Sequence, residues 1–537
     1  MKQLFRYIIL LSFFYLASCE KMFHPEETSI GKIDDYEKLL EAVGGVYGSL
    51  SRCFYDLEFY YETSVKGDDF ASGEPFYSSY YFDACYDEGI PLAHWAGFNS
   101  TWQLLYKTIA SANNILSQYS FDTKMGNATK EILGEIYLIR AYCYFRLTRT
   151  YGEIPVIDDI EISFSVPKSS YKQIYEFIVN DLNTAVRFLP KKNDEARIPY
   201  ITPHRGSAKA ILAEVYLSWA GYPVNDPSKY DLAAKTAGEV IDSAEYYGFS
   251  LLDDFADLWD HAHLYNSESV FSLYYQDPQQ AINTRGGDWI YNNSISPYYG
   301  VSGLGGNFII TAEAQRISPC YFATEINFYN NYPDGYRKES TFYTTIFKIN
   351  VEVDEQGNVI KLDSVYMHID TVDPCARIGY QKFYYDPYFE SSTDTLLPFG
   401  FFIGIPRIYL FRYSQTLLTY AEATARTGKL NELAYECVNQ IRRRANKLDL
   451  YAPSEFDLTP GLSAEIFADS VVWERAWEHA GEPEGRWFDL VRLEEVEELE
   501  QLRHPQEGGI PRYPITKEDY FMPIPQQDII LNPALEE

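Results

Sequence analysis

The feature that most limits the fold of this chain is a series of segments whose apolar residues recur at helical spacing. In residues 33–52, Leu39, Val43, Val46 and Leu50 fall at three- and four-residue intervals, which puts them on one face of a helix. Segments of the same kind span residues 98–119, 128–151, 170–189, 203–219, 230–244, 408–427, 430–447 and 463–480. Short loops join most neighbouring segments, so we predict a mainly α-helical fold of paired helices.

Two of these pairs resemble tetratricopeptide repeats. Residues 208–241 place Ala213, Tyr216 and Ala233 much as that repeat places its small and aromatic positions, and residues 417–445 do the same. Small residues let two helices approach closely, and the aromatic rings fill the space between them. No strict period runs along the chain, so we expect degenerate, interrupted helix pairs; an irregular helical protein is the alternative.

Two segments interrupt the helical pattern. Residues 53–96 are rich in Tyr, Gly, Asp and Ser and are predicted to form an insertion of long loops. Residues 246–406 are predicted to form an irregular, loop-rich subdomain that faces the ligand, with one small β-hairpin formed by residues 344–353 and 359–369 around a Gly-Asn turn. The helical scaffold is then supplied by residues 33–245 and 407–537.

The first 32 residues predict export and a lipid anchor. Lys2 and Arg6 precede a short apolar run over residues 7–16, which is too short to span a bilayer. The run ends in Leu-Ala-Ser before Cys19, the pattern of a bacterial lipoprotein signal. We expect a signal peptide over residues 1–18, acylation of Cys19 and a flexible tether over residues 19–32. Several acyl chains anchor a soluble domain stably, so the chain is expected to sit on a membrane without crossing it.

Composition narrows the class of ligand. The net charge of −32 argues against binding to nucleic acid or to anionic lipid headgroups. Aromatic residues make up 17% of the chain and include 48 Tyr, so many rings must reach the surface. Exposed rings suit flat ligands such as sugar faces and peptide backbones.

The cysteines and histidines give no sign of a metal or redox site. No CxxC motif occurs, and Cys143 and Cys437 lie on apolar helical stretches where we expect core packing. A Cys53–Cys85 bridge is left open. His261 and His263 form the one close histidine pair, but no third ligand is evident beside them. We therefore predict no metal and no cofactor.

A cluster of carboxylates near the C-terminus raises the question of catalysis. Its acidic members and the neighbouring arginines are Glu474, Glu478, Glu482, Glu484, Asp489, Arg475, Arg486 and Arg492. Paired carboxylates can act as acid and base, but here each has an arginine nearby. We expect a buried or half-buried network of ion pairs that holds the last helices to the scaffold, and no enzymatic activity.

Binding is the remaining function, and the two interrupting segments hold the candidate residues. Trp95 and Trp289 are expected to offer ring platforms for a pyranose face. Polar and aromatic partners are expected from Asp69, Tyr77, Tyr80, Asn99, Arg285, Asp288, Tyr291 and Asn292.

Several sequence blocks resemble the SusD/RagB family of nutrient-binding outer-membrane lipoproteins. Residues 140–157 (RAYCYFRLTRTYGEIPVI), 201–217 (ITPHRGSAKAILAEVYL) and 473–492 (WERAWEHAGEPEGRWFDLVR) are similar to three family blocks and occur in the family's order. The sequence departs from the family pattern at His479-Ala480 and at Pro483, and the usual Asn-Pro-Gly-Tyr ending is missing.

The resemblance implies a SusD-like fold with four helical hairpins and an irregular subdomain that carries most of the ligand site. It also implies a position on the outer membrane facing the cell exterior, and a TonB-dependent, SusC-like transporter that the protein caps as a lid. The expected ligand is an oligo- or polysaccharide. A peptide, as in the RagB branch, is the main alternative, and a surface glycoside hydrolase is a weaker one.

Overall fold

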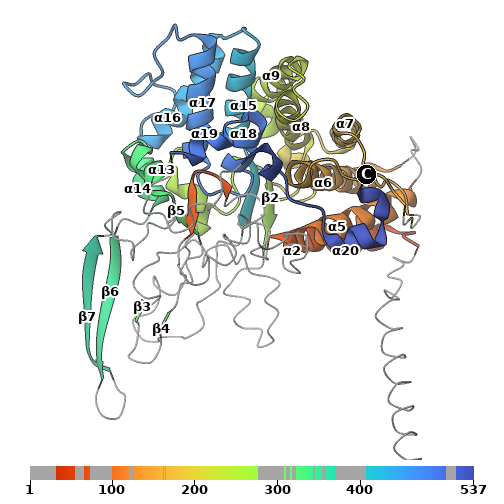
Figure 1. Ribbon diagram of the computed structural model, residues 1–537, viewed down its shortest axis with the longest axis horizontal. Helices are drawn as coiled ribbons and strands as arrows, with labels where there is room; N and C mark the ends of the chain where they lie inside the picture. Colours follow the sequence, from red (N-terminus) through yellow and green to blue (C-terminus); the bar gives the residue numbers. More distant parts are fainter. Residues whose placement is uncertain are drawn as a thin grey trace, which may run out of the picture.

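The computed structural model is mainly helical, as predicted (Figure 1). It describes residues 32–54, 66–72, 100–119, 125–160, 163, 165–275, 308–309, 315–316, 322–342, 345–353, 359–368, 407–502 and 516–536. The long helices are α2 (Tyr36–Cys53), α5 (Ser100–Ser117), α6 (Asn127–Tyr151), α7 (Tyr171–Phe188), α8 (Arg205–Ala220), α9 (Ser228–Ile241), α15 (Tyr413–Arg426), α16 (Glu432–Ala445) and α17 (Ala464–Glu478). Shorter helices are α10 (Ala244–Tyr247), α13 (Ile326–Asn331), α14 (Tyr336–Thr341), α18 (Arg486–Leu493), α19 (Val496–Glu500) and α20 (Gln526–Leu531).

The long helices pack in consecutive pairs. Helix α2 packs on α5, α6 on α7, α8 on α9, and α15 on α16. Helix α15 also packs on α9, so the C-terminal helices continue the array that the N-terminal helices begin (Figure 1). This arrangement confirms the fold of tetratricopeptide-like helix pairs.

Side-chain caps at the helix ends agree with the sequence. Asp35 caps α2, Asn431 caps α16 and Ser463 caps α17, each by accepting a hydrogen bond from a backbone N–H of the first turn. Ser170 and Gln173 form a reciprocal capping box at the start of α7. These caps satisfy N–H groups that have no partner inside the helix, so they set where each helix begins.

Among the residues that the structure describes, the strands form four separate two-stranded antiparallel pairs. The pairs are β1 (Phe70–Ser72) with β5 (Phe322–Thr324), β2 (Ser269–Tyr274) with β8 (Arg407–Arg412), β3 (Phe308–Ile309) with β4 (Gln315–Arg316), and β6 (Thr345–Val353) with β7 (Val359–His368). The β6–β7 pair confirms the predicted hairpin. The strands lie on one side of the helical array, away from α16 and α17 (Figure 1).

One predicted helix boundary is wrong. The sequence predicts a helix from residue 408, but residues Arg407–Arg412 form β8 and the helix begins at Tyr413. All six residues of β8 are buried, so the segment shows no alternation of apolar and polar residues. A fully buried strand and a buried helix look alike in such a run.

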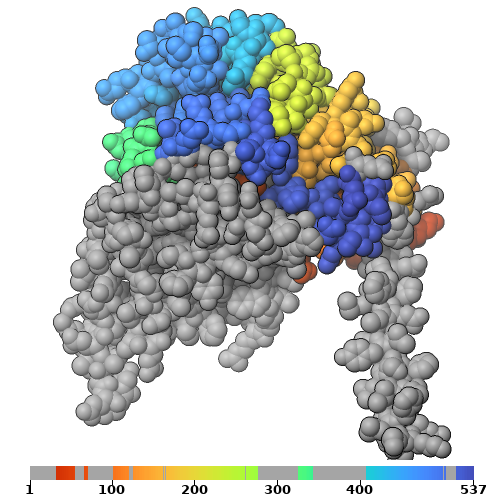
Figure 2. Space-filling model, viewed as in Figure 1, coloured from red at the N-terminus to blue at the C-terminus, as the bar shows by residue number. Residues whose placement is uncertain are grey.

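The two halves of the chain form one packed body. Figure 2 shows the last described residues, in dark blue, lying against the orange helices of the N-terminal half. The backbone N–H of Met522 donates to the carbonyl of Thr150 at 2.7 Å, and the Asn532 amide donates to the carbonyl of Val166 at 2.8 Å. Cys143 and Cys437 are buried, as predicted. Within the described residues, no helix combines the length and the apolarity needed to span a bilayer.

Gly221 allows the close packing of α8 on the C-terminal block. A Cβ at this position would lie 2.4 Å from the carbonyl oxygen of Arg492, which also accepts a hydrogen bond from the Tyr222 N–H at 2.9 Å. We expect Gly221→Ala to lower the free energy of unfolding by about 1–3 kcal/mol, because the backbone must shift to admit the methyl group. Urea unfolding followed by circular dichroism measures this loss.

Gly44 offers the matched control. It lies inside α2, and a Cβ there would meet no atom within 4 Å. Gly44→Ala is expected to raise stability by about 0.5–1 kcal/mol through helix propensity. Equal effects of the two substitutions would contradict the packing argument.

Candidate functional site

Most of the residues predicted to bind a ligand lie outside the described residues. They are Tyr77, Tyr80, Trp95, Asn99, Arg285, Asp288, Trp289, Tyr291 and Asn292. The predicted lipid attachment site Cys19 and the possible disulfide partner Cys85 also lie outside the described residues. Their roles stay predictions. Asp69 is described, and the described part also contains the stems from which both interrupting segments depart.

Asp69 lies inside the protein. Its side chain is 1% exposed, and Oδ2 accepts a hydrogen bond from the Gly481 N–H at 3.0 Å. Its carbonyl oxygen accepts from the N–H of Glu325 at 3.2 Å. Burial, followed by the neighbouring charge of Asp68, raises the pKa of the Asp69 carboxyl to about 7. These contacts make Asp69 an anchor between β1, α13 and the turn after α17, whereas the sequence predicted it to be a ligand contact.

The neighbours of Asp69 strengthen the same anchor. Asp68 accepts two hydrogen bonds from the guanidinium of Arg486, at 2.7 and 3.1 Å. Lys66 lies over the ring of Trp487, with its Nζ 5.3 Å from the ring centroid. Residues 66–72 therefore hold the middle of the predicted 53–96 insertion against the C-terminal block.

A second anchor is a buried network centred on Arg412, the last residue of β8. Its guanidinium donates to Glu268 at 2.7 Å, to Glu478 at 2.9 Å and to Glu482 at 2.8 and 3.0 Å. Arg444 binds both Glu268 and Glu478. All five side chains are buried. Burial alone would raise the pKa of Glu478, but the guanidinium groups of Arg444 and Arg412 outweigh it and lower the pKa to about 2.

This network ties the second interrupting segment to the helices near the paired strands β2 and β8. Glu268 lies within the segment and directly precedes β2, and Arg412 ends β8, through which the chain rejoins the helices. Arg337 of α14 lies within the segment, forms an ion pair with Glu474 at an N–O distance of 2.8 Å, and donates a hydrogen bond to Glu478 at 3.0 Å. The stems are thus fixed by charge-assisted hydrogen bonds in a buried setting, where such bonds are strong.

The predicted role of the C-terminal charges as an ion-pair network is confirmed. Their partners come from distant parts of the chain. The pairs are Arg475 with Glu214 of α8, Arg492 with Glu422 of α15, Arg486 with Asp68 of the turn before β1, and Glu484 with Arg146 and Arg149 of α6. A catalytic pair needs one carboxyl that holds a proton beside one that does not. Here arginines pair with the carboxylates, and their charge keeps Glu478 ionised.

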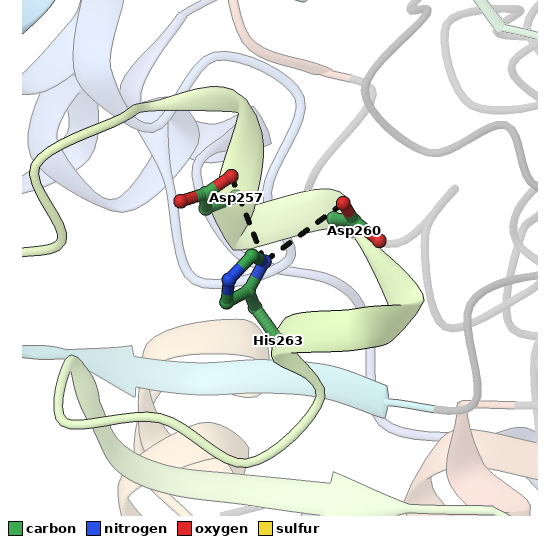
Figure 3. Close-up of side chains that lie close together, drawn as sticks. All are labelled: Asp257, Asp260 and His263. Carbon is green, nitrogen blue, oxygen red and sulfur yellow. Dashed lines mark ion pairs between the residues drawn. The ribbon is translucent and has the colours of Figure 1, made fainter.

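A further group of side chains, which the sequence analysis did not bring together, lies in residues 257–263, before β2. Asp257 belongs to the 3₁₀ helix η5 (Ala256–Trp259), Asp260 directly follows that helix, and His263 ends the 3₁₀ helix η6 (His261–His263). The three side chains point toward one another (Figure 3). The Nδ1 atom of His263 lies 3.6 Å from Oδ1 of Asp257 and 3.8 Å from Oδ2 of Asp260. The sequence feature that could have revealed this group is the three-residue spacing of Asp257, Asp260 and His263, because side chains three residues apart lie on the same side of a 3₁₀ helix.

Comparison with known proteins identifies the family. A family model described as "Starch-binding associating with outer membrane" matches residues 21–217, and a second, described as "SusD family", matches residues 404–537. Together they take in more than half of the chain and both parts of the helical scaffold. The chain belongs to the SusD/RagB family.

Relatives and solved structures within the family extend over most of the chain. A SusD-like protein P2 of Formosa agariphila is 24% identical, over 81% of this chain and 78% of its own. A SusD homolog from Bacteroides thetaiotaomicron superposes with a TM-score of 0.76 at 21% identity, covering 96% of this chain and 99% of its own. A laminarin binding SusD-like protein gives a TM-score of 0.64 at 21% identity, covering 93% and 98% of the two chains.

Proposed function

We propose that this protein is a surface-exposed outer-membrane lipoprotein that binds a glycan and delivers it to a TonB-dependent, SusC-like transporter. The observation that carries the proposal is the SusD-like fold over nearly the whole chain, with the stem of residues 246–406 and the middle of the 53–96 insertion both held against the helical frame. A rigid helical frame of this kind can hold loop segments of differing sequence in fixed positions for binding a ligand.

Two further observations favour a glycan over other nutrients. Related folds include a laminarin binding SusD-like protein and a structure solved with xylogluco-oligosaccharide. The interrupting segments of this chain are rich in Tyr and hold Trp95 and Trp289. Aromatic rings present an apolar face that matches the C–H face of a pyranose, while amide and carboxylate groups bond its hydroxyls.

Ligand binding tests the proposal directly. The purified protein is titrated by calorimetry, or run in affinity gels, against a panel that contains laminarin, xyloglucan and starch. We expect binding to at least one glycan, and we expect Trp95→Ala and Trp289→Ala to weaken it about tenfold or more, equivalent to about 1.4 kcal/mol each.

Tyr451→Ala provides the control. Tyr451 is 71% exposed, the highest value among the large apolar side chains that the structure describes, and it follows α16, outside both interrupting segments. Its loss is expected to leave glycan affinity unchanged. Affinity that survives both tryptophan substitutions, or that falls equally in the control, would contradict the proposed platforms.

Peptide capture and glycan cleavage are separate outcomes of the same panel. If the protein captures peptides in the manner of RagB, titration with a peptide library should release heat of binding, whereas titration with the glycans should release none. Released reducing ends after incubation with polysaccharide would instead indicate a glycoside hydrolase and overturn the proposal.

A further inference from the structure

The side chains of Asp257, Asp260 and His263 converge without forming hydrogen bonds to one another. The two Nδ1–carboxylate distances are 3.6 and 3.8 Å, longer than the 2.7–3.2 Å of a hydrogen bond. Donor atoms about 2.0–2.2 Å from one zinc ion in a tetrahedral arrangement are separated by roughly 3.3–3.6 Å. The three donor atoms all lie within 4.8 Å of one another, so they are spaced as ligands of a common ion would be, with small adjustments.

The surrounding contacts fix the direction of these donors. Oδ1 of Asp260 accepts a hydrogen bond from the Ala262 N–H at 2.8 Å, which leaves Oδ2 turned toward His263. Arg407, a buried residue of β8, donates to the carbonyl of His263 at 3.1 Å and also to the carbonyls of Leu264 and Leu258. The short helical segment that carries the cluster is therefore clamped to the strand on both sides, and outer contacts of this kind orient metal ligands.

The ligand types narrow the choice of ion. An imidazole nitrogen with two carboxylates suits Zn²⁺ and related transition metals, whereas Ca²⁺ and Mg²⁺ prefer sets made of oxygen alone. The side chains of Asp257, Asp260 and His263 are 35%, 52% and 45% exposed, which gives an ion a path from solvent. Three protein ligands leave a fourth position for water or an outside donor.

We propose that Asp257, Asp260 and His263 bind one Zn²⁺-class ion at the foot of β8. It would cross-link η5 and η6 beside the strand through which residues 246–406 rejoin the helices, and so stabilise that stem.

Zinc titration of the protein without a histidine tag, after dialysis against a chelator, tests the site. We expect calorimetry to show one Zn²⁺ bound per chain, and we expect zinc to raise the melting temperature. His263→Ala and the double variant Asp257→Asn/Asp260→Asn should each weaken zinc binding at least tenfold and abolish the shift in melting temperature. Ca²⁺ and Mg²⁺ at the same concentration should produce neither effect.

Glu465→Gln removes one exposed carboxylate from the first turn of α17 and controls for a loss of surface charge. It should bind zinc as the wild type does. Melting curves recorded without metal show whether each variant is folded. No zinc uptake by the wild type, or full-strength uptake by folded His263→Ala, would overturn the assignment.

Discussion

Replacing Arg412 with methionine is expected to destabilise the protein by about 3–5 kcal/mol. Arg412 is 1% exposed and supplies hydrogen bonds to Glu268, Glu478 and Glu482, whose carboxylates are themselves buried. Methionine keeps most of the side-chain volume but removes the positive charge. The three carboxylates would then share the remaining guanidinium groups of Arg444 and Arg337, and at least one negative charge would stay buried without compensation.

Urea unfolding at pH 7 measures this loss, and Lys429→Met is the matched control. Lys429 forms an exposed ion pair with Asp231 at 2.5 Å, with side-chain exposures of 68% and 57%. Exposed pairs of this kind contribute about 0–1 kcal/mol, so the control is expected to remain near the wild type. If the two methionine variants lost the same small amount of stability, the network around Arg412 would not be what fixes the stem of residues 246–406.

Replacing Asp69 with asparagine is expected to make the protein more stable above pH 7 and to change the pH dependence of unfolding. The folded pKa of Asp69 is about 7, against 3.8 for an ordinary aspartate. Because the folded state holds this proton more tightly, the contribution of the carboxyl to stability is full below pH 3.8 and is lost as pH rises through 7. The difference corresponds to a free energy of the order of 4 kcal/mol. Asparagine cannot ionise, and its amide oxygen can still accept the hydrogen bond from Gly481.

Unfolding free energies measured from pH 5 to pH 8.5 test this expectation. The advantage of Asp69→Asn over the wild type should grow from pH 5 to about pH 7 and level off above it. Asp457→Asn should instead be less stable than the wild type by a constant amount across this range. The hydrogen bond from Arg443 lowers the pKa of Asp457 below 3.8, so above pH 5 its carboxylate is charged in both the folded and the unfolded state. Parallel curves for wild type and Asp69→Asn would show that Asp69 is not protonated in the folded protein near pH 6.

The helices were predictable because their signals are local. Leu39, Val43 and Val46 reveal the buried face of α2 by their spacing, and Asp35 marks its start. Strand β8 was missed because its identity depends on pairing with β2, which lies far away in the sequence. The apolar run of residues 407–412 fits either a buried strand or a buried helix until that partner is known.

The candidate site was predictable in chemistry but not in geometry. The acidic and basic residues near the C-terminus indicated an ion-pair network, yet Arg412, Arg444 and Glu268 reach it from other elements. Asp69 was grouped with the ligand contacts because it lies in a polar, glycine-containing stretch. Its burial results from packing against the turn at Gly481, and no local pattern encodes such a long-range contact.

The pairing of β2 with β8 has a consequence for how this protein can diversify. Tyr274 and Arg407 face each other across the ladder, so the chain between them leaves and re-enters the helical frame at a single point. The entropy of closing such an excursion grows only slowly with its length. The parts of this excursion that do not contact the frame, unlike Arg337 of α14, can therefore differ widely in size and sequence at little cost to the stability of the frame.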